Sequence, residues 1–305
     1  MGSISEALRR AQQEREAIRQ RRIEEASAPS VEKRTPADAP APASAPPPAA
    51  EPVLDPMPPS ALPPIDLDAL APSFVVWHDR GTPVSEQYRA LRTRLMNFNE
   101  ARSPMVLAIT SSMTGEGKTT STLNVAMAFA ELQHLKVLAV DADLRRCSLT
   151  RAARAEDDAG VCDLLRGERQ LEEVLRPTTS PNLFFLPAGR LGDQNAAELL
   201  GSHSATGLIA EFRRRFHYVF VDLPPANAVA DASILGALCD GAVLVVRMHK
   251  TAEPNAKHAV RLLESSNVRL LGCLLIGQWH WKAPWLHEYG YGYDYQGSYS
   301  GYYQS

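Results

Sequence analysis

The sequence predicts an α/β fold in which a mostly parallel sheet is flanked by helices. Between residues 74 and 279, short apolar segments of strand length alternate with longer stretches of helical character. The short segments are apolar throughout, which is typical of strands that are covered on both faces. A glycine-rich loop joins the first of these segments to the next helical stretch, an arrangement that favours the same fold class.

The predicted elements follow one another in regular order. We expect strands at Val106–Thr110, Val137–Val140, Leu183–Leu186, Tyr218–Val221, Ala242–Val246 and Leu270–Ile276. We expect helices at residues 84–99, 118–133, 195–201, 205–215, 231–238 and 255–266. The strands are rich in β-branched and large apolar residues, and the helical stretches contain few residues that break helices.

Composition divides the chain into four regions. Residues 1–25 predict a weakly amphipathic helix, which is either solvated or a docking helix for a partner. Residues 26–72 hold most of the 23 prolines and predict a disordered, extended linker or a proline-rich ligand for a partner domain. Residues 73–280 form the predicted globular domain. Residues 281–305 are rich in tyrosine and glycine and predict a disordered tail.

The charge and the apolar content of the chain limit its partners and its location. The 305 residues include 32 basic and 35 acidic side chains, and the formal net charge is -3. This balance gives no reason to expect nucleic acid as a partner. No apolar run approaches the length that crosses a bilayer, and the N-terminus lacks the apolar core of a signal peptide. We therefore expect the chain in the cytoplasm.

The loop after the first strand has the residues of a phosphate site. Residues 110–120 read TSSMTGEGKTT and lead directly into a helix. Glycines let the loop direct its N–H groups at one phosphate, and the helix N-terminus adds favourable partial charge. A P-loop NTPase-like fold is therefore expected, although Ser112 stands where the strict pattern has its first glycine. The predicted nucleotide-binding residues are Thr114, Gly115, Glu116, Gly117, Lys118, Thr119 and Thr120.

Aspartates follow two of the later strands. Asp141 and Asp143 come after the strand that ends at Val140, and Asp222 comes after the strand that ends at Val221. The carboxyl ends of parallel strands share one edge of a sheet with the phosphate loop. A carboxylate at that edge can hold Mg²⁺ directly or through water.

Several motifs together resemble those of the bacterial tyrosine kinases, P-loop autokinases associated with polysaccharide export. The phosphate loop resembles the family's Walker A motif, VLAVDADLRR its second acidic motif, and YVFVDLPPA its Walker B motif. The resemblance covers about two thirds of the chain, from Trp77 to Trp279. The HRD, DFG and APE motifs of the common protein kinases are absent from the sequence.

The resemblance implies a role for each charged residue of the site. ATP and Mg²⁺ are the implied ligands, with Lys118 on the phosphates and Thr119, Asp143 and Asp222 organising the metal. Asp141 is implied to take the proton of the incoming tyrosine. The implied catalytic residues are thus Lys118, Asp141, Asp143 and Asp222. The family often places an asparagine against the adenine where this chain has Ile276-Gly277-Gln278, which leaves its base specificity open.

Two further features match the family. Glu86, Arg89 and Arg92 fit an E-x-x-R-x-x-R pattern, which in the family packs subunits into a ring; the alternative is a solvated helix face. The tail tyrosines are the expected sites of autophosphorylation, and a merely adhesive tail is the alternative. The expected phosphoacceptors are Tyr289, Tyr291, Tyr293, Tyr295, Tyr299, Tyr302 and Tyr303.

The resemblance also implies partners and a pathway. We expect a homo-oligomeric ring, a separate membrane-protein activator that holds the chain at the inner face of the membrane, an opposing phosphatase and a role in exopolysaccharide synthesis or export. One alternative is a nucleotide-binding scaffold of an export complex with weak or no kinase activity. Another is a partitioning-type positioning ATPase, which is disfavoured because Met113 stands where those proteins carry an extra lysine.

Overall fold

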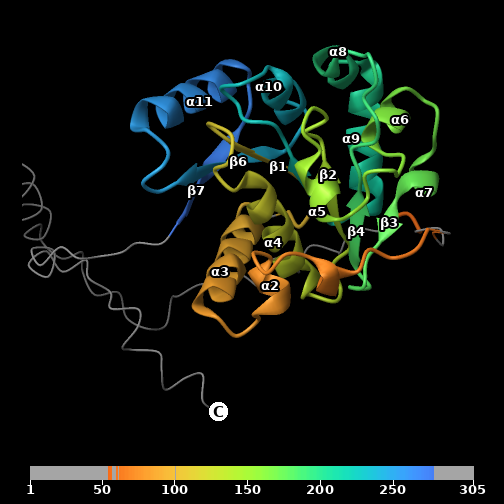
Figure 1. Cartoon of the computed structure of the whole chain (residues 1–305), viewed down its shortest axis with the longest axis horizontal. Coiled ribbons are helices and arrows are strands. Elements are labelled where there is room, and N and C mark those ends of the chain that lie inside the picture. Colours follow the sequence, from red (N-terminus) through yellow and green to blue (C-terminus); the bar gives the residue numbers. More distant parts are fainter. Residues whose placement is uncertain (1–53, 57–59, 61, 100, 278–305) are drawn as a thin grey trace, which may run out of the picture. The chain divides into compact units, whose positions relative to one another are not determined.

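A mostly parallel sheet forms the centre of the computed structural model, which describes residues 54–56, 60, 62–99 and 101–277. In the described part the sheet has seven strands in the order β3-β4-β2-β5-β1-β6-β7 (Figure 1). Every neighbouring pair is parallel except β3 and β4. The strands are β1 (Met105–Ser111), β2 (Val137–Asp141), β3 (Arg176–Pro177), β4 (Leu183–Leu186), β5 (Tyr218–Asp222), β6 (Gly241–Arg247) and β7 (Leu270–Ile276). The predicted fold class is confirmed.

Helices connect the strands and cover the sheet on both sides. They are α2 (Val75–His78), α3 (Pro83–Asn97), α4 (Lys118–Ala130), α5 (Ser148–Ala152), α6 (Val161–Leu165), α7 (Leu171–Val174), α8 (Ala196–Leu200), α9 (His203–Arg215), α10 (Asp231–Gly236) and α11 (Glu253–Ser265), with a 3₁₀ turn, η1 (Leu67–Ala69), before them. The α2–α4 group lies on one side of the sheet and α8–α11 on the other (Figure 1).

The alternation of side chains along β1 explains why its sequence is apolar throughout. Val106 and Ala108 belong to the core cluster beneath α9 and α10. Leu107 and Ile109 point the other way, into the cluster beneath α4. Both faces of the strand are therefore buried, as the uninterrupted apolar pattern predicts.

Helix α4 is enclosed almost on all sides, and this fixes its position over the sheet. Nearly all of its residues are buried. Near its C-terminal end, the Phe129 ring packs on Tyr218 and Phe220 of β5, with ring centroids 4.5 and 4.9 Å apart. The helix begins at Lys118, so the packing of its body holds its N-terminus beside the end of β5.

The end of the proline-rich segment is part of the domain. The predicted linker extends to residue 72, but Ile65, Leu67 and Leu70 are buried in the cluster beneath α4. Ile65 also exchanges backbone hydrogen bonds with the β3 region: its N–H donates to Pro177 O at 2.9 Å, and its carbonyl accepts from Thr179 N at 3.0 Å. The density of prolines in the sequence conceals these three apolar residues, which secure the segment by burial.

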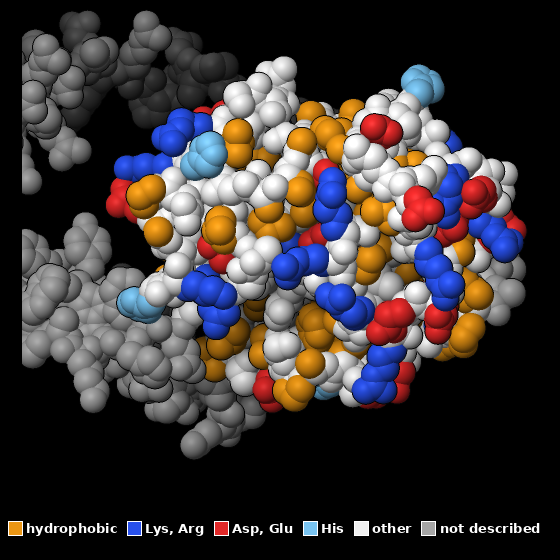
Figure 2. All heavy atoms as spheres, turned by 45° about the horizontal axis from the view of Figure 1, so that its top comes forward, with side chains coloured by type: hydrophobic (Ala, Val, Ile, Leu, Met, Phe, Trp, Pro, Cys, Tyr) orange, Lys and Arg blue, Asp and Glu red, His pale blue; other side chains and the backbone are white. Residues whose placement is uncertain are grey.

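The remaining regions predicted from sequence, the N-terminal helix at residues 1–25 and the tail at 281–305, lie outside the described residues. None of the helices that the structure describes has both the length and the apolar character needed to span a bilayer. Figure 2 shows acidic and basic side chains interspersed over one face of the molecule, in keeping with the balanced composition.

Candidate functional site

The phosphate loop lies between the end of β1 and the start of α4, as the sequence predicts. Gly115 and Gly117 adopt positive φ angles of 75° and 89°, a region that favours glycine. Gly117 has a second reason to lack a side chain, because a Cβ there would lie 2.3 Å from Ile276 Cδ1. The end of β7 therefore packs against the phosphate loop. Its last residue, Ile276, begins the segment for which the sequence leaves the base specificity open. Gln278 lies outside the described residues.

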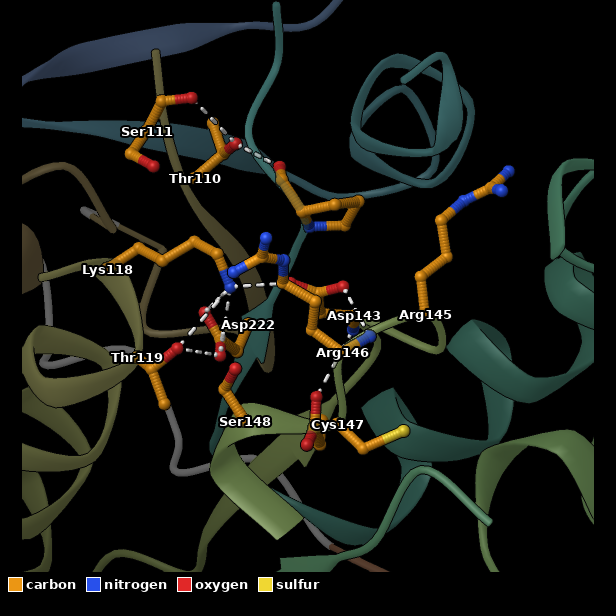
Figure 3. A network of polar contacts seen from close by, with 12 residues as sticks. Thr110, Ser111, Lys118, Thr119, Asp143, Arg145, Arg146, Cys147, Ser148 and Asp222 are labelled. Carbon is orange, nitrogen blue, oxygen red and sulfur yellow. Dashed lines mark hydrogen bonds and ion pairs between the residues drawn. The ribbon is translucent and has the colours of Figure 1, made fainter. Parts of the chain in front are cut away.

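Lys118 and Thr119, at the start of α4, converge on Asp222 at the end of β5 and on Asp143 in the loop after β2 (Figure 3). Lys118 Nζ lies 2.9 Å from Asp143 Oδ2 and 3.3 Å from Asp222 Oδ1. Thr119 Oγ1 donates a hydrogen bond of 2.7 Å to Asp222 Oδ2. The structure thus brings together residues that are more than 100 positions apart in the chain.

Strand register explains why the acidic residues meet. Strands β2 and β5 are neighbours, and Asp141 is the Cα partner of Asp222 across the pair. Asp143 follows two residues later, and its N–H donates to Asp141 Oδ1 at 3.2 Å. The shared edge of the parallel sheet gathers all three carboxylates beside the phosphate loop.

Burial sets the electrostatics of this cluster. Asp141, Asp143 and Asp222 are at most 1% exposed, and Lys118 is 7% exposed. Burial, reinforced by the charge of Asp222, raises the pKa of Asp141 to about 7. Burial also raises the pKa of Asp222, against the opposing effects of Lys118 and the Thr119 hydrogen bond.

The charge of Lys118 is maintained by its neighbours. Burial disfavours its protonated form, but the charges of Asp222 and Asp143 outweigh burial and raise its pKa. One ammonium group nevertheless faces three carboxyl groups, so the cluster favours the binding of a further cation.

The residues present fit a magnesium ion. Asp143 Oδ2 is buried and accepts no hydrogen bond within the described residues; its contact is the ion pair with Lys118. The Thr119 hydroxyl and the Asp222 carboxylate lie beside it, and oxygen ligands of this kind suit Mg²⁺. No group of three or more His, Cys, Asp or Glu side chains in the described ranges is arranged to hold a metal by itself. Mg²⁺ usually completes its shell with substrate phosphates and water, which agrees with such a partial site.

Asp141 is held in place by a residue of α5. Its Oδ2 accepts hydrogen bonds from both the N–H and the hydroxyl of Thr150, at 2.7 and 2.8 Å. Thr150 lies on α5, so Asp141 ties the end of β2 to that helix. Sequence analysis did not identify Thr150, because the contact depends on a helix that is only five residues long.

Arg145 is a second residue to which the sequence gave no role. It points away from the lysine–aspartate cluster (Figure 3) and pairs with Asp231 at the start of α10, with Nε 2.8 Å from Oδ2 and Nη2 3.2 Å from Oδ1. Asp231 is buried, so this two-pronged contact anchors the loop that carries Asp143. Arg145 belongs to the run Asp143–Arg146 that sequence analysis noted, but no local pattern in the sequence identifies Asp231 as its partner.

The predicted oligomerisation residues lie on α3, away from the phosphate loop. Arg89 and Arg92 both bind Glu131 at the C-terminal end of α4, with Nη–Oε distances of 2.6 and 3.0 Å. Glu86 pairs with Arg89, and its side chain is 48% exposed. The two arginines thus join α3 to α4 within the chain. The predicted phosphoacceptor tyrosines lie outside the described residues.

Several known proteins are similar to this chain in sequence and in fold. Residues 105–262 match the AAA domain family. The tyrosine-protein kinase YwqD of Bacillus subtilis is 37% identical over 207 residues, which cover 68% of this chain and 85% of that protein. The kinase domain of the Escherichia coli tyrosine kinase ETK has a TM-score of 0.63 and 27% identity, covering 67% of this chain and 79% of that chain. The chimerical protein CapA2B2 has a TM-score of 0.63 and 27% identity, covering 70% of this chain and 93% of that chain.

The family match extends from the start of β1 into α11 and contains all three acidic or glycine-rich motifs. The curated relative aligns over most of its own length, so the likeness extends well beyond the phosphate loop. The chain belongs to the bacterial tyrosine-protein kinases.

Proposed function

We propose that this chain is an ATP-dependent tyrosine autokinase that transfers the γ-phosphate of ATP to tyrosines of its own C-terminal tail. The observation that carries the proposal is the convergence of Lys118 and Thr119 of the phosphate loop on Asp143 and Asp222. Membership in a family of tyrosine kinases supports phosphate transfer to tyrosine rather than to water.

The chain's own residues are suited to hold and orient the nucleotide. The N–H groups of the phosphate loop and the start of α4 bind the phosphates, and Lys118 neutralises charge on the β- and γ-phosphates. For this, Lys118 leaves part of its present contact with Asp143 and Asp222. Thr119, Asp143 and Asp222 would hold Mg²⁺, which would stabilise the charge that develops on the phosphate oxygens during transfer.

Transfer itself exchanges one P–O bond for another. The tyrosine Oη attacks the γ-phosphorus, the bond from that phosphorus to the β,γ-bridging oxygen breaks, and ADP leaves with the electron pair. The phenolic proton passes to Asp141, whose position beside Asp222 supports this role. Asp141 Oδ2 accepts two hydrogen bonds from Thr150, whereas Oδ1 accepts one from Asp143 N at 3.2 Å, so Oδ1 is the oxygen proposed to take the proton.

The acceptors proposed are Tyr289, Tyr291, Tyr293, Tyr295, Tyr299, Tyr302 and Tyr303. Each phosphate adds nearly two negative charges at neutral pH, and the sequence has no Lys or Arg after Lys282. Successive phosphorylation would therefore repel neighbouring tails in a homo-oligomeric ring. A phosphatase is the proposed means of reversal.

The proposed setting is the synthesis or export of an exopolysaccharide, at the cytoplasmic face of the membrane. The family supports this setting, and a separate membrane-protein activator is the proposed partner. Deletion of residues 1–53 tests the tether, because the deletion spares the buried Ile65, Leu67 and Leu70. We expect recruitment to membranes to be lost; recruitment equal to that of the full chain would exclude these residues as the tether.

Incubation of the purified chain with Mg·ATP, followed by phosphotyrosine mapping by mass spectrometry, tests the proposal. We expect phosphate on the tail tyrosines of the wild type and none on Lys118→Met. Lys257→Met is the matched control, because Lys257 is an exposed lysine on α11 that pairs only with Glu253 in the described structure. Intact ATP binding without phosphotyrosine, even with the membrane partner added, would instead favour a nucleotide-binding scaffold.

A further inference from the structure

The last residue of β6 and the turn that follows it contact the phosphate loop. Lys250 Nζ and Arg247 Nη1 both donate hydrogen bonds to the carbonyl of Gly115, at 2.9 and 3.2 Å. Thr251 Oγ1 donates to Glu116 Oε1 at 2.5 Å. We call residues 247–251 the clasp. Its contacts reach two consecutive loop residues from a point more than 130 positions later in the chain.

The clasp has a fixed internal shape. Thr251 N donates to Arg247 O at 2.8 Å, and Arg247 N donates to Thr251 Oγ1 at 2.9 Å. Because the Thr251 hydroxyl accepts this bond, its own hydrogen is free to point at Glu116. Met248 N donates to Ile276 O at 2.8 Å, which attaches the clasp to the end of β7. The clasp is therefore a rigid support for the loop.

The contact with Gly115 fixes the direction of a peptide N–H. The Gly115 carbonyl and the Glu116 N–H belong to one planar trans peptide group, so they point in opposite directions. The clasp holds the carbonyl outward, which turns the Glu116 N–H toward the inside of the loop. This N–H donates no hydrogen bond within the described residues, so it is available to an anion.

Two cationic donors on one carbonyl also strengthen that peptide as a hydrogen-bond donor. Hydrogen bonds from charged groups are stronger than neutral ones, and bonds in a chain polarise one another. The positive charges of Lys250 and Arg247 also favour an anion in the loop, because both side chains lie beside it.

The side chain of Glu116 braces the loop from the other end. It is 1% exposed, and it accepts bonds from Ser112 Oγ at 2.9 Å, Met113 N at 2.9 Å and Thr251 Oγ1. It thus joins the first residues of the loop to its last turn and to the clasp. Loss of the Thr251 hydroxyl would remove the contact between the Glu116 side chain and the clasp, and only the bonds from Lys250 and Arg247 to the Gly115 carbonyl would still join the loop to it.

We propose that Lys250, Arg247 and Thr251 are positioning residues that hold the Gly115–Glu116 peptide in the orientation that binds phosphate. The proposal rests on the nucleotide site described under the proposed function and assigns it a support outside the phosphate loop. The clasp acts on the phosphate chain alone, so its loss weakens every ligand that places a phosphate in the loop by the same factor.

Binding of ATP and of inorganic tripolyphosphate to the full chain, measured by calorimetry, tests the clasp. Thr251→Val replaces the hydroxyl by a methyl group of the same size, and Lys250→Met removes a charge. We expect each to raise the Kd of both ligands about five- to tenfold, the range expected for a lost hydrogen bond. Thr251→Ser should restore wild-type affinity, and Lys257→Met should not change it. Under turnover, KM for ATP should rise in the two variants while kcat at saturating ATP stays unchanged.

Several results would overturn the proposal. Wild-type affinity in both Thr251→Val and Lys250→Met would show that the clasp has no effect on phosphate. Failure of Thr251→Ser to restore affinity, or an equal loss in Lys257→Met, would show that the effect is not specific to these contacts. A wild-type chain that binds neither ligand would contradict the proposed function along with the clasp, whereas normal wild-type binding with unaltered variants would contradict the clasp alone.

Discussion

At the residue scale, a lysine with three buried carboxyl groups around it determines what single substitutions should do. The three aspartates have different surroundings. Thr150 donates two hydrogen bonds to Asp141, one oxygen of Asp143 accepts no hydrogen bond, and the Thr119 hydroxyl donates to Asp222. The same residue type should therefore have different functions at the three positions. Substitution of each carboxylate by its amide separates them with little change in shape.

Asp141→Asn should abolish transfer and leave ATP binding nearly unchanged. The amide keeps an oxygen that can accept the Thr150 hydrogen bonds, but it cannot take the tyrosine proton. Loss of a general base lowers a rate by about 100- to 10,000-fold. The measurements are the initial rate of phosphotyrosine formation and the Kd of ATP. A rate near that of the wild type would remove Asp141 from the chemistry.

Asp143→Asn should alter the dependence on magnesium. The substitution removes the buried oxygen that accepts no hydrogen bond, so the metal loses a negatively charged ligand. We expect the Mg²⁺ concentration for half-maximal transfer to rise by at least about tenfold. Substitution of a residue that only hydrogen-bonds to a metal ligand already lowers metal affinity by about that factor. Asp157→Asn serves as the control, because this side chain is 94% exposed and pairs with Arg190. An unchanged magnesium dependence would exclude Asp143 as a ligand.

Sequence reasoning found the residues of the phosphate loop and the strand ends because local patterns encode them. A strand, a glycine-rich turn and a lysine at a helix start are adjacent in sequence, as are Asp141 and Asp143 and the strand before them. Thr150, Asp231 and Thr251 have no such signature. They act through partners that only the packed sheet brings near, such as Glu116 for Thr251.

At the element scale, the contact between α3 and α4 is held by an ion-pair network. Helix α3 begins where expected, with Thr82 as its cap, accepting from Ser85 N at 3.3 Å, and Pro83 in its first turn. Arg89 and Arg92 then bind Glu131 at the far end of α4 from the phosphate loop. Burial opposes ionisation of Glu131, but the hydrogen bonds and charges of the two arginines outweigh it and lower its pKa.

Glu131→Gln should therefore reduce stability in a pH-dependent way. The unfolded carboxyl titrates near its ordinary value and the folded one lower, so its contribution is present above the ordinary pKa and is lost as the pH falls through the folded value. At pH 7 we expect a loss of about 1 kcal/mol, a value that allows for solvent screening. Denaturant unfolding at pH 7 and in acid measures it. A difference from the wild type that persisted at low pH would contradict the account.

Leu67→Ala tests whether the end of the proline-rich segment stabilises the domain. Leu67 is 1% exposed beneath α2 and α4, and its loss leaves a cavity. We expect unfolding to become easier by about 2–5 kcal/mol. Leu275→Ala, at a side chain that is 62% exposed, should change stability far less. A loss at Leu67 as small as the one expected at Leu275 would mean that the burial of Leu67 does not stabilise the domain.

Most elements could be predicted from sequence, but several short ones could not. Six strands and six helices lie within a few residues of their predicted positions, and β4 and α8 are among them although they have only four and five residues. Strand β3 has two residues, and α2, α5, α6 and α7 have four or five. Segments of that length complete barely one turn, and their structure comes from packing against the sheet.

At the scale of the whole molecule, the motif on α3 predicts which face joins one copy of the chain to another. Arg89 and Arg92 are engaged within the chain, so Glu86 is the part of the predicted motif that is open to a second copy. The exposed side chain of Val84 lies two residues before it in the same helix. Glu86→Ala should then lower the mass measured by light scattering without lowering the melting temperature. Arg92→Ala should lower both, because it also breaks the contact with Glu131. An unchanged mass in both variants would exclude this face from assembly.

The measurement that tests the central claim most directly is the simultaneous quantification of phosphotyrosine and free phosphate during turnover of Mg·ATP. The account predicts that phosphotyrosine accumulates in the wild type, that Lys118→Met forms none, and that Lys257→Met behaves as the wild type. The result that would contradict it is release of inorganic phosphate by the wild type with no phosphotyrosine formed. The same cluster of Lys118, Asp143 and Asp222 would then serve hydrolysis, as in a positioning ATPase.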